Sequence, residues 1–130
     1  MTEVVDVLNE VRDASREVEK AADSLYHKIR AFTGHVDEQG EWVEGVGPRY
    51  RAALDTALIE IYERAISDGQ RPPAEDIRTA LAVRRVREAE PALCVDHMRL
   101  EADIQALRQW ISNRKAAINA KQSVLKGERP

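Results

Sequence analysis

Apolar side chains near the start of the chain recur at alternating intervals of four and three residues. Positions with this spacing share one face of a helix and form the stripe along which it packs against another helix. The pattern runs unbroken through residues 4–32, and Ser15 is its one polar member. It therefore predicts a long helix over residues 2–32. The stripe consists of Val4, Leu8, Val11, Ser15, Val18, Ala22, Leu25, Ile29 and Phe32.

A second stripe with the same spacing lies near the C-terminus and predicts a helix over residues 91–126. No other segment is long enough to pair with the first helix along its full length. Some of its positions are polar. Either they set the register of the helix pair at some cost in stability, or the far end of the helix extends into solvent. The stripe consists of Leu93, His97, Leu100, Ile104, Leu107, Ile111, Arg114, Ile118, Lys121 and Leu125.

Two shorter helices are predicted between the long ones, over residues 48–67 and 73–88. A turn that contains glycine and two consecutive prolines separates them, and such a turn interrupts helical structure. Pro91 predicts a break or a kink near residues 88–91, because proline lacks the amide hydrogen that a helix interior requires.

Residues 33–47 contain four of the six glycines and follow the first long helix. Two interpretations stay open for this segment: a small two-stranded hairpin around Gly40, or an irregular loop. Trp42 is its most prominent side chain. It either anchors the segment on the helix ends or stands at the tip of an exposed binding loop.

These elements together predict an all-α fold, an elongated antiparallel helical bundle or coiled coil with two long and two shorter helices. The length of 130 residues predicts a single domain over residues 1–130. The long helices are expected to run antiparallel, with the shorter helices packed at one end of the pair.

The amino-acid composition indicates the cellular compartment of the protein. Cys94 is the one cysteine, so no disulfide can form within the chain, as is usual in the reducing cytosol. No apolar run approaches the ~20 residues of a membrane span, and the N-terminus lacks the apolar core of a signal peptide. We therefore predict a cytoplasmic protein that does not contact a membrane.

Charge is distributed unevenly along the chain. Residues 1–70 contain 8 Lys/Arg and 15 Asp/Glu, a net −7, whereas residues 71–130 contain 12 Lys/Arg and 8 Asp/Glu, a net +4. One interpretation is that the two halves form neighbouring helices that attract each other. The other is a basic face that binds nucleic acid. That face would consist of Arg84, Arg85, Arg87, Lys115, Lys121 and Lys126.

No catalytic or cofactor-binding motif occurs in the chain, so we predict no catalytic residue, no cofactor and no enzymatic activity. Glu90, Cys94, His97 and Glu101 do form one polar stripe with metal-competent groups. A structural zinc site needs four ligands from converging segments, however, and the chain has no second cysteine. No metal site is predicted.

Residues 50–125 carry a succession of helical motifs. In order, these are Tyr50-Arg51-Ala52-Ala53-Leu54, a Gly69-to-Pro73 turn, Ile77 with Leu81-Ala82, and Ala116-Ala117-Ile118 with Gln122. With these features the chain resembles a family of small helical proteins of tailed bacteriophages and prophages. The resemblance implies an accessory product of a phage early region, encoded near recombination or replication functions and present in the host cytoplasm. It transfers no functional residues.

We accordingly expect a non-enzymatic phage or prophage accessory protein that forms a homodimer or higher oligomer and binds a partner protein or a nucleoprotein complex. Two alternatives stay open: a direct DNA- or RNA-binding protein that uses its basic second half, and a structural or host-inhibiting interaction protein. Unpaired apolar stripes favour self-association. The expected contact residues are Leu8, Val11, Val18, Leu25, Ile29, Leu100, Ile104, Leu107, Ile111 and Ile118.

Overall fold

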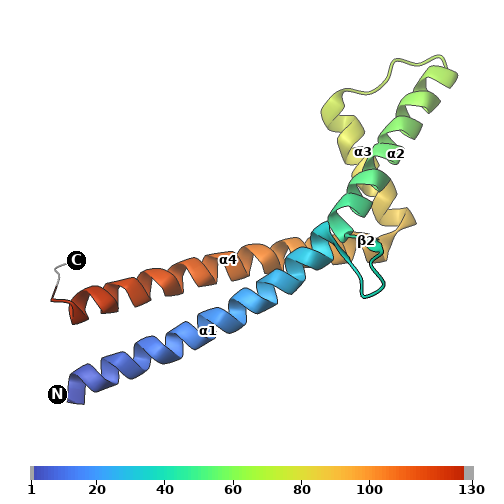
Figure 1. Ribbon diagram of the computed structural model, residues 1–130. Helices are drawn as coiled ribbons and strands as arrows, with labels where there is room; N and C mark the ends of the chain where they lie inside the picture. Colours follow the sequence, from blue (N-terminus) through green and yellow to red (C-terminus); the bar gives the residue numbers. More distant parts are fainter. Residues whose placement is uncertain (1, 128–130) are drawn as a thin grey trace. The chain divides into compact units, whose positions relative to one another are not determined.

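A computed structural model describes residues 2–127 of the chain (Figure 1). The predicted all-α class is confirmed, since one small two-stranded sheet is the only other regular structure in this range. The helix bounds agree with the predicted bounds to within two residues. The elements are α1 (Thr2–Thr33), β1 (Gly34–Val36), β2 (Trp42–Glu44), α2 (Val46–Ser67), α3 (Glu75–Ala89) and α4 (Pro91–Leu125).

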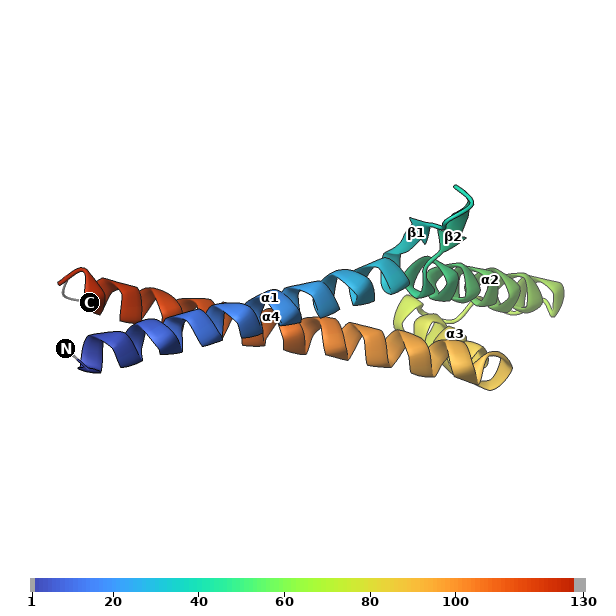
Figure 2. The same ribbon diagram turned by 60° about the horizontal axis from the view of Figure 1, so that its bottom comes forward.

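The chain divides into two compact units. The first unit comprises residues 1–29 and 102–130, and the second comprises residues 30–101. In the first unit, α1 and α4 lie alongside each other and run in opposite directions (Figures 1 and 2). The predicted antiparallel pairing of the two long helices is therefore confirmed in this unit.

Three ion pairs join α1 and α4 in the first unit. The Glu10 carboxylate lies 2.9 Å from the Lys121 ammonium group, and the equivalent Glu17–Arg114 distance is 3.7 Å. Moving along α1 from one pair to the next means moving equally far back along α4, so the register is constant. The spacings correspond to about two and three helical turns. The third pair joins Lys28 and Asp103 at 3.2 Å.

Two of these ion pairs show what the polar residues of the α4 stripe do. Arg114 and Lys121 are exposed rather than buried in the helix contact, and both meet a carboxylate of α1. They hold the register of the antiparallel pair, as one of the two interpretations proposed. The Glu10 and Glu17 pairs each join the acidic and basic halves of the chain, as predicted from the uneven charge distribution.

The stripe of α1 that contacts α4 is rotated relative to the predicted one. Val11, Val18 and Leu25 are half-buried as expected, but Val4, Leu8 and Ala22 are exposed. The physical reason is that α4 approaches α1 on the other side of the central valines, where small side chains allow close approach. The half-buried residues on that side are Val7, Ala14, Ala21 and Lys28.

In the second unit, α2 and α3 pack against each other around a small core. Ala57 and Ala82 are 4% and 0% exposed, and such small residues at a helix crossing let two helices approach closely. Ile61 and Val86 complete this core. Partly buried residues that pack around it are Tyr50, Ala53, Leu54, Leu58 and Cys94.

Residues 33–47 form the predicted hairpin rather than an irregular loop. β1 and β2 pair antiparallel, with His35 opposite Val43. The Asp37 carboxylate accepts hydrogen bonds from the Gln39 and Glu41 amides at 3.0 and 2.9 Å, which closes the turn. Trp42 stands in β2 beside this turn rather than at its tip. Its ring lies over Gly34, which follows the end of α1, and the residue is still 63% exposed.

The chain breaks between α3 and α4, as Pro91 predicted. Glu90 has φ −135° and ψ 66°, which is not helical, and its amide still donates to the Val86 carbonyl. α2 ends at Ser67, two residues before Gly69, whose positive φ of 69° suits a helix C-terminus. The ends of α3 and α2 thus both have local causes that can be recognised in the sequence.

Replacing Ile61 by alanine tests the α2–α3 core. Ile61 is 8% exposed, so its loss leaves a cavity and should lower the free energy of unfolding by about 2–5 kcal/mol. Ile59→Ala is the matched control, because Ile59 is 57% exposed on the same helix, and it should cost under about 0.5 kcal/mol. Urea denaturation followed by circular dichroism measures both. Equal losses would contradict the assigned core.

A double-mutant cycle tests the register of α1 and α4. Glu17→Lys combined with Arg114→Glu should show a coupling energy of about 0.2–1 kcal/mol, because the pair is exposed, and added salt should reduce it. Asp13→Lys with Arg114→Glu is the control. Asp13 is also exposed on α1 but forms no ion pair with Arg114. A coupling as large in the control would contradict the register.

Candidate interaction surfaces

An apolar groove runs along the outer face of α2, within the second unit. Ile59, Tyr62 and Ile66 are 57%, 44% and 56% exposed, although each is large and apolar. Their spacing of three and four residues places them on one face of the helix. Leu58 is half-buried beside them, and Arg78 of α3 borders the groove. We call these five residues the α2 groove.

Arg78 gives the α2 groove a specific polar feature. Its guanidinium carbon lies 6.0 Å from the centroid of the Tyr62 ring, within reach of a weak cation–π contact. Its Nε atom is buried and has no hydrogen-bond acceptor among the described residues. A buried donor without an acceptor is costly. The positive charge of Arg78, at the border of the groove, is the feature that an acidic group could approach.

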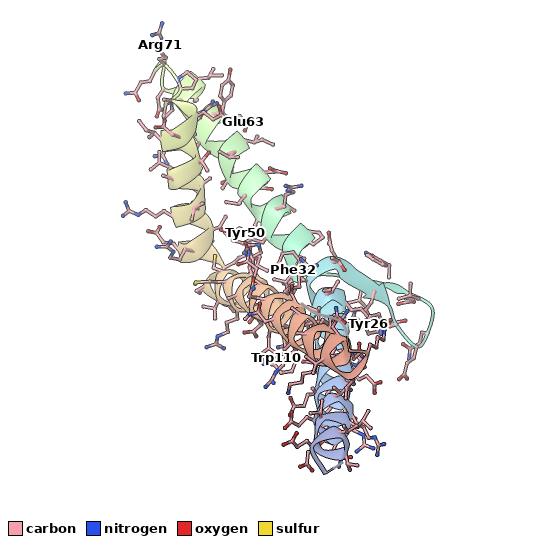
Figure 3. The ribbon with its side chains drawn as sticks, turned by 90° about the vertical axis from the view of Figure 1, so that its left-hand side faces the viewer. Tyr26, Phe32, Tyr50, Glu63, Arg71 and Trp110 are labelled. Atoms are coloured by element: carbon pink, nitrogen blue, oxygen red, sulfur yellow. The ribbon has the colours of Figure 1, made fainter. Side chains whose placement is uncertain are left out.

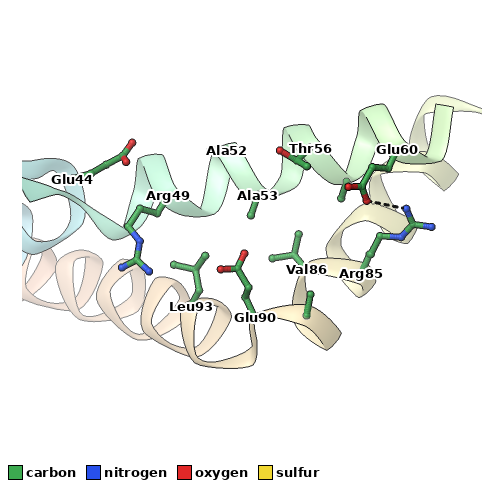
Figure 4. Close-up of a pocket in the computed structure, with 12 residues that line it drawn as sticks. Glu44, Arg49, Ala52, Ala53, Thr56, Glu60, Arg85, Val86, Glu90 and Leu93 are labelled. Carbon is green, nitrogen blue, oxygen red and sulfur yellow. Dashed lines mark hydrogen bonds and ion pairs between the residues drawn. The ribbon is translucent and has the colours of Figure 1, made fainter. Parts of the chain in front are cut away.

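A second hollow lies where α2 passes the α3–α4 junction (Figure 4). Its floor is formed by small residues, among them Ala53 and Ala57. Charged groups of both signs surround it, and one of them, Arg85, donates to the Glu60 carboxylate at 3.4 Å. The lining contains no histidine or cysteine. The charged residues around it are Glu44, Arg49, Glu60, Arg85 and Glu90.

His97 is held between two aromatic rings in the second unit. It stacks on Tyr50 with ring centroids 4.1 Å apart and lies 5.4 Å from the Phe32 ring; Figure 3 shows Tyr50 and Phe32 close together. Its Nδ1 atom is 3.7 Å from the Glu101 carboxylate. At its predicted stripe position, His97 therefore makes aromatic contacts that join α4 to Phe32 of α1 and Tyr50 of α2.

The polar stripe of α4 does not converge into a metal site. No group of three or more His, Cys, Asp or Glu side chains within residues 2–127 is arranged to hold a metal ion. Of the four stripe residues, Cys94 packs against the α2–α3 core and His97 is stacked on Tyr50. Glu90 borders the hollow of Figure 4.

The residues proposed for nucleic-acid binding are partly engaged within the chain. Arg84 pairs with Glu88 at 3.1 Å and Arg85 with Glu60 at 3.4 Å; Lys121 belongs to the ion pairs between α1 and α4. Arg84 and Arg87 share one face of α3, whereas Arg85 reaches α2. The arginines lie in the second unit and the lysines in the first. The exposed residues without a described acidic partner are Arg87, Lys115 and Lys126.

The expected self-association residues differ in burial. Only Ile104 and Ile118 are buried, and both belong to α4. Leu8 is 48% exposed. A pair of helices covers only one side of each stripe, so incomplete burial is the physical expectation for an isolated pair. The half-buried members are Val11, Val18, Leu25, Ile29, Leu100, Leu107 and Ile111.

Sequence reasoning missed the α2 groove. The available signal was a second apolar set on the same helix, Ile59, Tyr62 and Ile66, beside the stripe that packs on α3. The set that packs on α3 has the more regular helical spacing, and no local feature of the sequence shows that the second set stays uncovered. The orphaned Arg78 Nε could not have been found without coordinates, because it depends on a contact between two helices.

Comparisons with protein-family models, with curated proteins and with solved structures found no match for this chain. No helix within residues 2–127 is long and apolar enough to cross a membrane.

Tyr50→Phe tests the packing of the aromatic contact through its pH dependence. Burial raises the pKa of the Tyr50 phenol above its ordinary value of 10.0, and Cys94 and Glu101 raise it further. A raised pKa in the folded state gives stability that is present below pH 10 and is lost as the pH rises through the folded pKa. The wild type should therefore lose stability relative to Tyr50→Phe above pH 10. Parallel stability curves from pH 8 to 11 would contradict this.

Proposed function

We propose that this protein is a non-enzymatic helical adaptor that self-associates through its long helices and binds a partner protein through the α2 groove. The groove is the observation that carries the proposal. Contiguous exposed apolar side chains are typical of protein interaction sites, and their helical spacing suits a partner helix with apolar anchors. The positive charge of Arg78 at the border of the groove suits one carboxylate of that partner.

Self-association is supported by the first unit. The apolar surface of α1 is wider than its contact with α4 can bury, and Val5 and Leu8 of α1 remain about half exposed at 55% and 48%. Symmetric pairing of such surfaces is the usual outcome in soluble proteins. An adaptor that presents two or more copies of one groove also gains avidity for a partner with several sites.

The resemblance of residues 50–125 to phage and prophage accessory proteins supports a setting in DNA recombination or replication, in the cytoplasm of the host. In that setting the partner is a protein component of the recombination or replication complex. Direct nucleic-acid binding is less well supported, because half of the basic residues that it requires already have acidic partners within the chain.

Selection from a library of helical peptides tests the α2 groove. Peptides are selected on the wild-type protein, and their affinities are then measured against Tyr62→Ala and Ile66→Asp variants. The expected winners carry apolar residues at helical spacing and one acidic residue, and they should lose at least about tenfold in affinity on either variant. Val95→Asp is the control, since Val95 is an exposed apolar residue of the second unit outside the groove.

Two results would overturn this part of the proposal. One is selection of peptides that bind the Tyr62→Ala and Ile66→Asp variants as tightly as the wild type. The other is selection of peptides without acidic residues whose affinity does not change in an Arg78→Met variant, which keeps the long apolar stem but removes the donor.

Binding of labelled DNA separates the adaptor from a nucleic-acid-binding protein. The adaptor proposal predicts no steep dependence of affinity on salt concentration, because such a slope reports contacts to phosphates. Tight binding at low salt that disappears when Arg84, Arg85 and Arg87 are all replaced by glutamate would contradict the adaptor proposal and favour the basic face. Circular dichroism confirms that the triple variant keeps its helices.

A further inference from the structure

We propose that the second copy in the oligomer pairs with the outer flank of α1, antiparallel, across a two-fold axis that passes beside Ser15. This inference rests on the proposed self-association and adds the surface, the direction and the register. The outer flank is the side of α1 that faces away from the ion pairs with α4. It consists of Val5, Leu8, Arg12, Ser15, Glu19, Ala22 and Tyr26.

The outer flank carries exposed apolar residues at both of its ends, and the polar residues Arg12, Ser15 and Glu19 lie between them. Val5, Leu8 and Tyr26 are 55%, 48% and 56% exposed, and Ala22 is exposed as well. Glu10 and Glu17, which pair with α4, lie on the other side of the central valines. The exposed apolar side chains thus lie at the two ends of a flank that spans about six helical turns, with the half-buried Ser15 near its centre.

The outer flank lies at an angle around α1 that leaves room for a second helix beside α4. α4 contacts α1 between the column of Val7 and Ala14 and the column of Val11 and Val18. The outer flank is centred about 100° further round the helix on a heptad scale, close to the right angle between two neighbours in a four-helix bundle. A second helix can therefore lie against α1 without displacing α4.

The outer flank is complementary to itself when two copies run antiparallel. An axis beside Ser15 places Leu8 against Ala22 of the second copy, a large side chain against a small one. It also places Val5 against Tyr26 and brings the two Ser15 hydroxyl groups together. Size complementarity of this kind is what a well-packed helix contact requires.

Charge decides the direction. In the antiparallel register Arg12 faces Glu19 of the second copy, and the symmetry generates this pair twice. Neither residue has an ion-pair partner among the described residues. In a parallel pairing, by contrast, Arg12 would face Arg12 and Glu19 would face Glu19, and like charges across a helix interface are destabilising.

α4 does not offer an equivalent surface. The flank of α4 that lies on the same side of the helix pair carries Arg108, Lys115 and Gln122, all exposed and polar. Two copies that met through this flank would oppose positive charges without burying apolar area. On this side of the helix pair the apolar contact therefore belongs to α1, and the second copy is the occupant that its charges fit.

Disulfide trapping tests the axis. Single cysteines are introduced into a Cys94→Ala background, and a mild oxidant is added. Ser15→Cys should form a covalent dimer, because a residue beside the axis lies within disulfide reach of its own copy. Ala22→Cys alone should not, since the antiparallel register places the two cysteines roughly 20 Å apart. Asp13→Cys, exposed on another face, controls for random collision.

The direction has its own positive test. A chain that carries both Leu8→Cys and Ala22→Cys should cross-link efficiently, although neither single variant does. Efficient cross-linking of Ala22→Cys by itself would indicate a parallel pair and overturn the inference. Failure of Ser15→Cys to cross-link in a protein that still has a dimeric mass would overturn the inference and leave the proposed self-association intact. A single-chain mass would overturn both.

Charge reversal gives an independent measurement. Arg12→Glu should raise the dimer dissociation constant at least about tenfold, because it replaces two attractive contacts by two repulsive ones. Adding Glu19→Arg to the same chain should restore the wild-type value. Analytical ultracentrifugation measures the constants. An Arg12→Glu effect that Glu19→Arg does not reverse would exclude the Arg12–Glu19 pairing.

Discussion

A helix that packs against a single neighbour can bury only the side that faces it, and this limit governs the structure. α1 carries an apolar stripe that is wider than one neighbour covers. α4 takes the side with Val7, Ala14 and Ala21, and the side with Leu8 and Ala22 is left exposed. The same limit acts on α2, where one face packs on α3 around Ile61 and another carries exposed Tyr62. Each unit therefore keeps one apolar helix face uncovered.

Small residues and charges decide which side of a helix is used inside the chain. Ala57 and Ala82 let α2 and α3 approach, and Ala14 and Ala21 line the side of α1 that meets α4. Exposed ion pairs contribute little free energy individually. Three pairs with one constant register nevertheless exclude other alignments of two helices, because a shift by one turn would separate all of them.

Much of the fold could be predicted because its signals are local. Pro91 announced the break after α3, and the glycines of residues 33–47 allowed the hairpin. The start of α2 is instructive: Pro48 suggested the first position, yet the helix begins at Val46. The first four amides of a helix have no internal acceptor, so proline fits anywhere in that turn. The predicted start of a helix can therefore be wrong by one or two residues, because proline is allowed at several positions of the first turn.

The candidate surfaces were less predictable because they depend on contacts between distant segments. A spacing of 3.5 residues fits either side of the α1 valines equally well, so the sequence did not separate the exposed Leu8 and Ala22 from the residues that meet α4. Likewise Arg78 has no unusual neighbours in the sequence, and its orphaned Nε arises only where α3 meets α2. The sequence shows which faces are apolar, but the three-dimensional contacts determine which of them remain uncovered.

The most direct test of this account is the mass of the intact protein in solution. Light scattering at micromolar concentration should give at least twice the 14.7 kDa of one chain, because we propose that a second copy covers the exposed face of α1. A mass of one chain across the whole concentration range would contradict the account.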